Sequence, residues 1–204
     1  MKQYAVAINP VQFVKDCAPT DFKLVSLENP IQESLLAALN SRGEATNASP
    51  LGSIVVDGKD GKIEVGMFVD PEAEIHGEMV KGERQPARLN SFATLIRRAA
   101  LGAQGDNPIG VAPVAGRVIV CRINDERDPM PMTEADGYIL ITQLAELLGN
   151  GYIGDERFDQ RFLNWMSEQE VQTSVVKMAK EISRLGKLAK KDRDNAPVTP
   201  VSYT

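Results

Sequence analysis

The sequence predicts an α+β protein: a mostly antiparallel sheet with two inserted helices in the N-terminal two-thirds, then a helical C-terminal third and an extended tail. Short segments rich in strand-forming residues alternate with turn residues up to about residue 128, which is typical of antiparallel strands. After residue 133 the apolar residues recur at helical spacing. The tail contains Pro197 and Pro200, which are incompatible with a continuous helix.

Each strand is predicted by a short run of apolar or β-branched residues: 4–8, 22–27, 53–56, 62–69, 116–123 and, less regularly, 74–80. Val118 to Cys121 form a continuous apolar run, which predicts a strand buried on both faces. Residues 57–61 (Asp-Gly-Lys-Asp-Gly) predict the turn of a hairpin. They do not form an EF-hand, because Lys59 and Phe68 stand where that loop needs oxygen ligands.

Two helices are expected among these strands. Asn29 and Pro30 are typical of a helix start, with Asn as the cap and Pro in the first turn. We expect Gly43 to end this helix, before a loop over 44–52, and its buried stripe to be formed by Ile31, Leu35, Leu36 and Leu39. The second helix is expected over 91–101, with Arg97 and Arg98 in its last turn and its inward face formed by Phe92, Leu95, Ile96 and Ala99.

The chain changes character near a Pro-containing charged segment, residues 125–132. We therefore predict a strand-rich domain over 1–128, a helical subdomain over 129–194 and an extended tail over 195–204. The subdomain is expected to contain three helices. Thr133 and Asp136 resemble a capping box for the first, Asp155 opens the second, and residues 167–170 (Ser-Glu-Gln-Glu) cap the third, which runs to about residue 191.

Catalytic and metal chemistry find little support in the sequence. His76 is the single histidine, and on a strand it would share a face with Glu74 and Glu78, as a general base and its orienting acid would. An exposed strand of mixed polar residues explains the same pattern. Cys17 and Cys121 match no metal-ligand spacing and are expected to be reduced and mostly buried. We predict no enzyme, no metal and no cofactor.

The last helix has two distinct faces. Its apolar residues form a seam, at spacings of four and three, made of Val171, Val175, Met178, Ile182, Leu185 and Ala189. Its basic residues form a second row, which we call the basic face: Lys177, Lys180, Arg184, Lys187 and Lys191. Residues 177–204 contain seven basic and three acidic side chains, a net charge of +4, so the preceding residues must carry −9 of the total of −5.

Three interpretations of this helix stay open. It is an ordinary amphipathic helix with a solvated basic face; or it pairs with a neighbouring subunit, the basic face meeting acidic residues of that neighbour; or it contacts nucleic acid through Lys–phosphate pairs. Aromatic residues are only 5% of the chain and do not alternate with the basic ones, which disfavours a base-stacking surface.

The extended tail favours the subunit interpretation, because a segment of this composition buries too little on its own chain to offset its ordering entropy. We expect it to lie on a neighbouring chain through Pro197, Val198, Pro200, Val201 and Tyr203. The leading expectation is a non-catalytic structural subunit of a homo-oligomer or, by analogy, a viral particle. It would be cytoplasmic or inside the assembled particle, because no segment resembles a secretion signal or a membrane span. A nucleic-acid-associated protein is the alternative.

Overall fold

The computed structural model describes residues 2–10, 22–39, 47–88, 90–103 and 113–149, and seven further helical residues between 180 and 194. Its main sheet has the strand order β2-β1-β7-β4-β3, with β8 paired to β7, and every pairing is antiparallel. The strands are β1 (Gln3–Ile8), β2 (Phe22–Leu27), β3 (Ser49–Gly58), β4 (Gly61–Val69), β7 (Val118–Ile123) and β8 (Pro129–Met130). A small second sheet contains β5 (Glu78–Val80) and β6 (Glu83–Gln85).

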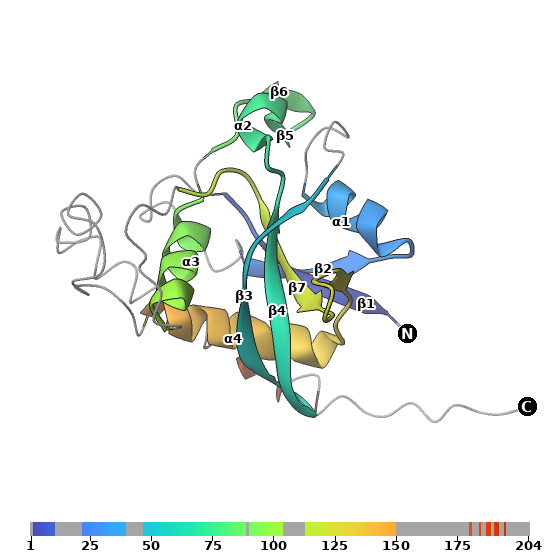
Figure 1. Ribbon diagram of the computed structural model, residues 1–204, viewed down its shortest axis with the longest axis vertical. Coiled ribbons are helices and arrows are strands. Elements are labelled where there is room, and N and C mark those ends of the chain that lie inside the picture. The colour runs from blue at the N-terminus through green and yellow to red at the C-terminus, as the bar shows by residue number, and fades with distance from the viewer. Residues whose placement is uncertain are drawn as a thin grey trace, which may run out of the picture.

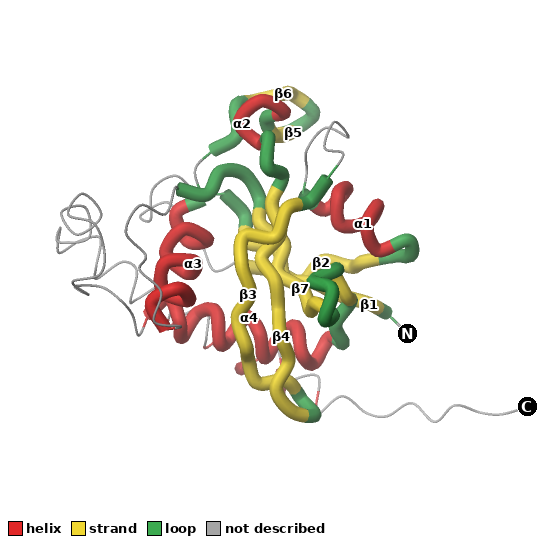
Figure 2. Tube along the Cα trace, in the orientation of Figure 1, coloured by secondary structure: helices red, strands yellow, loops and turns green. Residues whose placement is uncertain are grey.

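The helices are α1 (Ile31–Ala38), α2 (Ala73–His76), α3 (Ser91–Ala103) and α4 (Glu134–Gly149). Of these, α1, α3 and α4 cover the two faces of the main sheet, and α2 lies with β5 and β6 beyond one end of it (Figures 1 and 2). One buried cluster joins the sheet to α3 and α4, for example through Phe92, Ile96 and Leu144. A second cluster joins the other face to α1 through Leu35 and Leu39. The α+β class with an antiparallel sheet is therefore confirmed.

The strand β7 lies at the centre of this sheet and is buried on both faces, as its apolar run predicts. Val118, Ile119, Val120 and Cys121 are all fully buried. The strand pairs on one side with β1, where Val6 lies opposite Val120, and on the other with β4, where Met67 lies opposite the same residue. It therefore joins the β1–β2 hairpin to the β3–β4 hairpin.

The β3–β4 hairpin is tighter than expected and is held against α4. Its turn is Lys59 and Asp60 alone, because Gly58 already pairs with Gly61. Thr133 and Asp136 form the predicted capping interaction, with the Asp136 N–H donating to Thr133 Oγ1 over 3.1 Å. In return, the Thr133 hydroxyl donates to Asp136 Oδ2 over 2.8 Å, and Asp136 Oδ1 accepts the Lys59 N–H over 2.7 Å. The Asp136 side chain thus links the cap of α4 to the hairpin turn.

The helix α4 comes unusually close to β2. A Cβ atom at Gly137 would overlap a methyl group of Leu24, so a larger residue at this position would have to displace the end of the Leu24 side chain. Glycine costs about 1 kcal/mol in a helix interior relative to alanine. Since Leu140, Ile141 and Leu144 are buried with the strands, α4 belongs to the core of the sheet.

The expected strand over 74–80 was wrong in its first half, where the chain forms α2. The His76 and Gly77 N–H groups donate to Glu72 and Ala73 carbonyls, over 2.9 and 2.8 Å. Gly77 then adopts a φ of 70°, which ends the helical turn and lets β5 begin at Glu78. The polar side chains before and within this segment stabilise the turn, as described below.

Three further expectations needed correction. Pro30, with an extended backbone, is the N-cap of α1 in place of Asn29, and no side chain caps that helix. The strand β3 begins at Ser49, inside the expected loop, because a register shift between Pro50 and Ser53 accommodates the irregular sequence. The helix α3 continues to Ala103, so Arg97 and Arg98 lie within the helix and not in its last turn.

After α4, all residues except the seven helical ones between 180 and 194 lie outside the described part of the chain. They include the expected helix after Asp155, the seam and the tail over 195–204. The division after residue 128 stays a prediction. Within the part of the chain that the structure describes, no helix is long and apolar enough to cross a membrane.

Candidate functional site

The basic face is described at four of its five positions. Lys180, Arg184, Lys187 and Lys191 are helical and exposed, and their spacings of four, three and four place them on one side of the helix. Lys177 lies outside the described residues. Leu188, next to this row, is also 43% exposed.

One ion pair places this helix beside the end of α4. The Lys187 Nζ atom lies 4.0 Å from Glu146 Oε1. Both side chains are at least half exposed, so the pair contributes little stability. The four described residues of the basic face stay exposed to solvent.

The other predicted contact residues all lie outside the described residues. They are the seam, namely Val171, Val175, Met178, Ile182, Leu185 and Ala189, and the tail contacts, namely Pro197, Val198, Pro200, Val201 and Tyr203.

His76 contacts two carboxylates, Asp70 and Glu72, in place of the predicted partners Glu74 and Glu78. Its Nδ1 atom lies 2.7 Å from Asp70 Oδ2, and its Nε2 atom lies 3.4 Å from Glu72 Oε2. The Asp70 side chain is only 3% exposed, and its Oδ1 atom also accepts the Glu72 N–H over 3.0 Å. Because α2 is helical, a residue four positions before His76 faces the ring, which the expected strand geometry did not allow.

The two acids expected to orient His76 have other positions. Glu78 is buried and binds Arg88, accepting from its backbone N–H over 3.0 Å and from its Nε over 2.9 Å. Glu74 is exposed on α2. Both ring nitrogens of His76 thus face carboxylates of its own segment, and the ring itself is largely buried.

A cavity of about 410 Å³ lies between α2, α3 and the end of β4. It is lined by side chains from four separate parts of the chain, including Leu51, Val69, Glu74, Arg97 and Val114. Asp70 and Glu72 also contribute to this lining, so the His76 cluster forms one wall. The volume lies within the range that small-molecule sites occupy.

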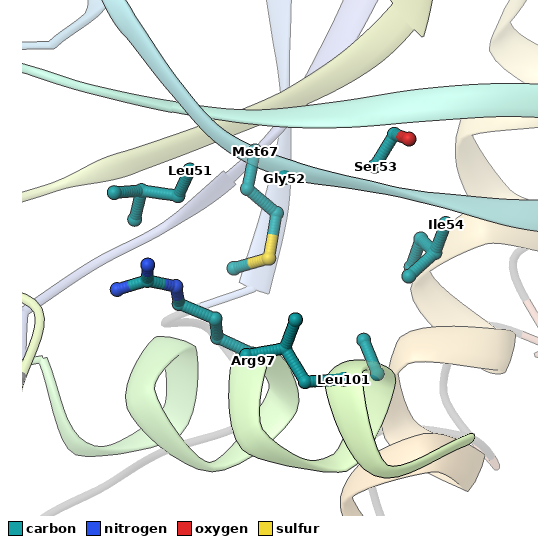
Figure 3. Close-up of a pocket in the computed structure, with 8 residues that line it drawn as sticks. Leu51, Gly52, Ser53, Ile54, Met67, Arg97 and Leu101 are labelled. Atoms are coloured by element: carbon teal, nitrogen blue, oxygen red, sulfur yellow. The ribbon is translucent and has the colours of Figure 1, made fainter. Parts of the chain in front are cut away.

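Arg97 is the cation of this cavity. Figure 3 shows its side chain leaving α3 toward Leu51 and Met67, where it also borders a smaller void of about 30 Å³. The Nε atom is buried and has no hydrogen-bond partner among the residues that the structure describes. Burial, and secondarily the neighbouring Arg98 charge, lower the pKa of Arg97 from its ordinary value.

No group of three or more His, Cys, Asp or Glu side chains in the described ranges is placed to hold a metal ion. Cys121 is a free, buried thiol, and burial raises its pKa to about 12. Cys17 lies outside the described residues. The buried thiol is therefore protonated at neutral pH and is a poor nucleophile.

Comparison with protein-family models, curated proteins and solved structures finds no match to this chain.

Proposed function

We propose that this protein is a non-catalytic assembly subunit that contacts neighbouring chains through its C-terminal helix and tail. The observation that carries the proposal is the exposure of Lys180, Arg184, Lys187 and Lys191 on one side of that helix. The contact would join copies of this chain, inside the cytoplasm or an assembled particle.

Charge complementarity supports a partner of the same sequence. The C-terminal 28 residues carry +4 and the remainder −9. Opposite charge on the two parts of one chain favours a head-to-tail contact between copies over a contact between two like surfaces. Exposed acidic side chains that suit the basic face occur in the described part, for example Asp125, Glu126 and Asp128 beside β8.

The burial of His76 supports a non-catalytic protein, because a general base must reach the proton that it removes. The ring itself is largely buried, with its side chain 11% exposed.

Binding to nucleic acid is the second candidate, favoured by the same row of basic side chains. Each Lys–phosphate contact would release counterions, so affinity would fall steeply with salt. The net charge of −5 opposes binding over the whole surface and restricts the contact to this helix.

Light scattering after size exclusion, with absorbance at 260 and 280 nm, separates these functions. Assembly predicts a mass above that of one chain with a protein-like absorbance ratio, and loss of that mass when residues 195–204 are removed. Reversing charge in Lys180→Glu, Lys187→Glu and Lys191→Glu together should have the same effect. The matched control reverses three exposed lysines elsewhere, Lys23, Lys59 and Lys62, and should assemble normally.

A high 260/280 ratio that disappears in salt would assign the basic face to nucleic acid instead. A monomer with a protein-like ratio at all concentrations would contradict both functions.

A further inference from the structure

The cavity beside α3 is lined by two opposite charges that do not pair with each other. These are Arg97, which is partly buried, and Glu74, which is exposed. In the described part of the chain, neither side chain forms an ion pair, and the buried Arg97 Nε has no hydrogen-bond partner. A buried or partly buried cation without an acceptor is costly unless a ligand supplies one.

The remaining charges of the cavity are already engaged. Asp70 is bound by His76 and by the Glu72 N–H, and Glu72 lies 3.4 Å from the second nitrogen of His76. These carboxylates make the cavity unfavourable for a dianion such as phosphate, because they add negative charge on the wall next to Glu74. A single carboxylate carries less charge than a dianion and is repelled less. It also suits Arg97, because guanidinium groups bind carboxylates through two parallel hydrogen bonds.

Most of the remaining lining residues are apolar; Ser49 is polar, and Ile75 is 69% exposed. Leu51 and Val69 come from the sheet, Ile75 from α2 and Val114 from the segment before β7. A ligand for this cavity therefore combines a carboxylate, a positive group that Glu74 can accept, and an apolar body.

We propose that this cavity binds an apolar α-amino acid, with its carboxylate on the Arg97 guanidinium and its ammonium group on Glu74. The cavity volume of about 410 Å³ accommodates such a molecule. The site is independent of the assembly function, because its residues lie on β3, β4, α2, α3 and the segment before β7 and not on the C-terminal helix.

Calorimetric titration of the full chain with L-leucine and L-phenylalanine tests this site. Each amino acid is compared with two half-ligands: for leucine, 4-methylpentanoate lacks the ammonium group and 3-methylbutylamine lacks the carboxylate. Because a hydrogen bond to a charged group contributes about 1.5–3 kcal/mol, each half-ligand should bind about 10- to 100-fold more weakly than its amino acid.

The variants assign each charge. Arg97→Met should reduce leucine affinity by a similar factor and leave 3-methylbutylamine binding unchanged. Glu74→Gln should do the reverse, weakening leucine and the amine but not 4-methylpentanoate. Arg122→Met and Glu33→Gln, which alter exposed side chains away from the cavity, serve as matched controls and should bind leucine normally.

The midpoint of thermal unfolding distinguishes a variant that has lost the binding site from one that does not fold. Arg97→Met removes a desolvated cation, so its midpoint should equal or exceed that of the parent chain. Arg97→Lys retains the charge but not the paired donors and should bind leucine at intermediate strength. Absence of binding by both amino acids at millimolar concentration, or equal leucine affinity in folded Arg97→Met, would overturn the proposal.

Discussion

Gln143 of α4 binds the backbone of Asp57 through both ends of its side-chain amide. Its Nε2 atom donates to the Asp57 carbonyl over 2.6 Å, and its Oε1 atom accepts the Asp57 N–H over 2.9 Å. Within the described ranges β3 pairs only with β4, so it is an edge strand. The glutamine amide therefore satisfies the two groups that a further strand would bind at this position.

Replacing Gln143 by alanine should lower the free energy of unfolding by about 1 kcal/mol, because two hydrogen bonds at the strand edge are lost. Urea denaturation measures this change. Gln32→Ala, at an exposed position of α1, controls for the effect of alanine on a helix and should change stability by less than about 0.5 kcal/mol. Equal stability of the two variants would contradict the edge role of Gln143.

Asn90→Ala should be more harmful, at about 3 kcal/mol, because one buried side chain serves three backbone groups. Its Nδ2 atom donates to the Ile8 and Gly116 carbonyls over 3.0 and 2.9 Å, and its Oδ1 atom accepts the Ala93 N–H over 3.0 Å. Removing it leaves buried polar groups without partners and takes the cap from α3.

Thermal and urea unfolding of the Asn90 variant are compared with Asn47→Ala, which changes an exposed loop residue and should be nearly neutral. A loss below about 1 kcal/mol for Asn90→Ala would show that water replaces its hydrogen bonds.

His76→Ala should cost about 1–3 kcal/mol, since it removes the partner of a carboxylate that is only 3% exposed. Glu72→Gln should cost less than about 0.5 kcal/mol, because the Glu72 side chain is 62% exposed. Urea denaturation gives both values. Hydrogen exchange should also accelerate at the His76 and Gly77 amides in the first variant alone. Equal effects of the two substitutions would contradict the central role of the Asp70–His76 pair.

Cys121 should make the fold sensitive to alkali. Burial raises the pKa of its thiol to about 12, whereas an unfolded thiol titrates near 9.0. Above pH 9 the unfolded chain therefore loses a proton that the folded chain keeps, and stability falls by up to about 1.4 kcal/mol per pH unit. Below pH 9 this contribution is constant.

The measurement compares urea denaturation of Cys17→Ser with Cys17→Ser/Cys121→Val between pH 8 and 10.5. Only the chain that retains Cys121 should show the thiol-dependent decline. In the same background, dithiobis(nitrobenzoate) should react with Cys121 only after unfolding. Rapid reaction in the folded chain would show that the thiol is accessible.

The regular strands could be predicted from the sequence because their signal is local. The apolar runs at 22–27, 62–69 and 118–121 correspond closely to β2, β4 and β7. The prediction for 74–80 was wrong in its first half. The partners of His76 are Asp70 and Glu72, which precede this segment, so the segment alone does not indicate a helix. Side-chain partners from outside the segment thus decided between helix and strand.

No local sequence pattern indicated the cavity. Leu51, Glu74, Arg97 and Val114 come from four parts of the chain, and neither their spacing nor their residue types set them apart. Arg97 stands near the end of the helix that the sequence predicts, where an exposed arginine has an ordinary electrostatic role. Its burial depends on the sheet packing over α3, which no single segment encodes.

The central position of β7 has a consequence for the order in which the chain is completed. The β1–β2 and β3–β4 hairpins each form from neighbouring segments, whereas their common partner begins at Val118. During synthesis both hairpins precede this strand. Until it is made, the edges of β1 and β4 that pair with it stay unpaired. Since Tyr4 also exchanges backbone hydrogen bonds with Met132, both of 2.9 Å, the first strand is fixed at both edges only after Met132, which precedes α4, has emerged. The sheet is therefore closed late, by contacts of long sequence separation, which is the pattern of slow folding.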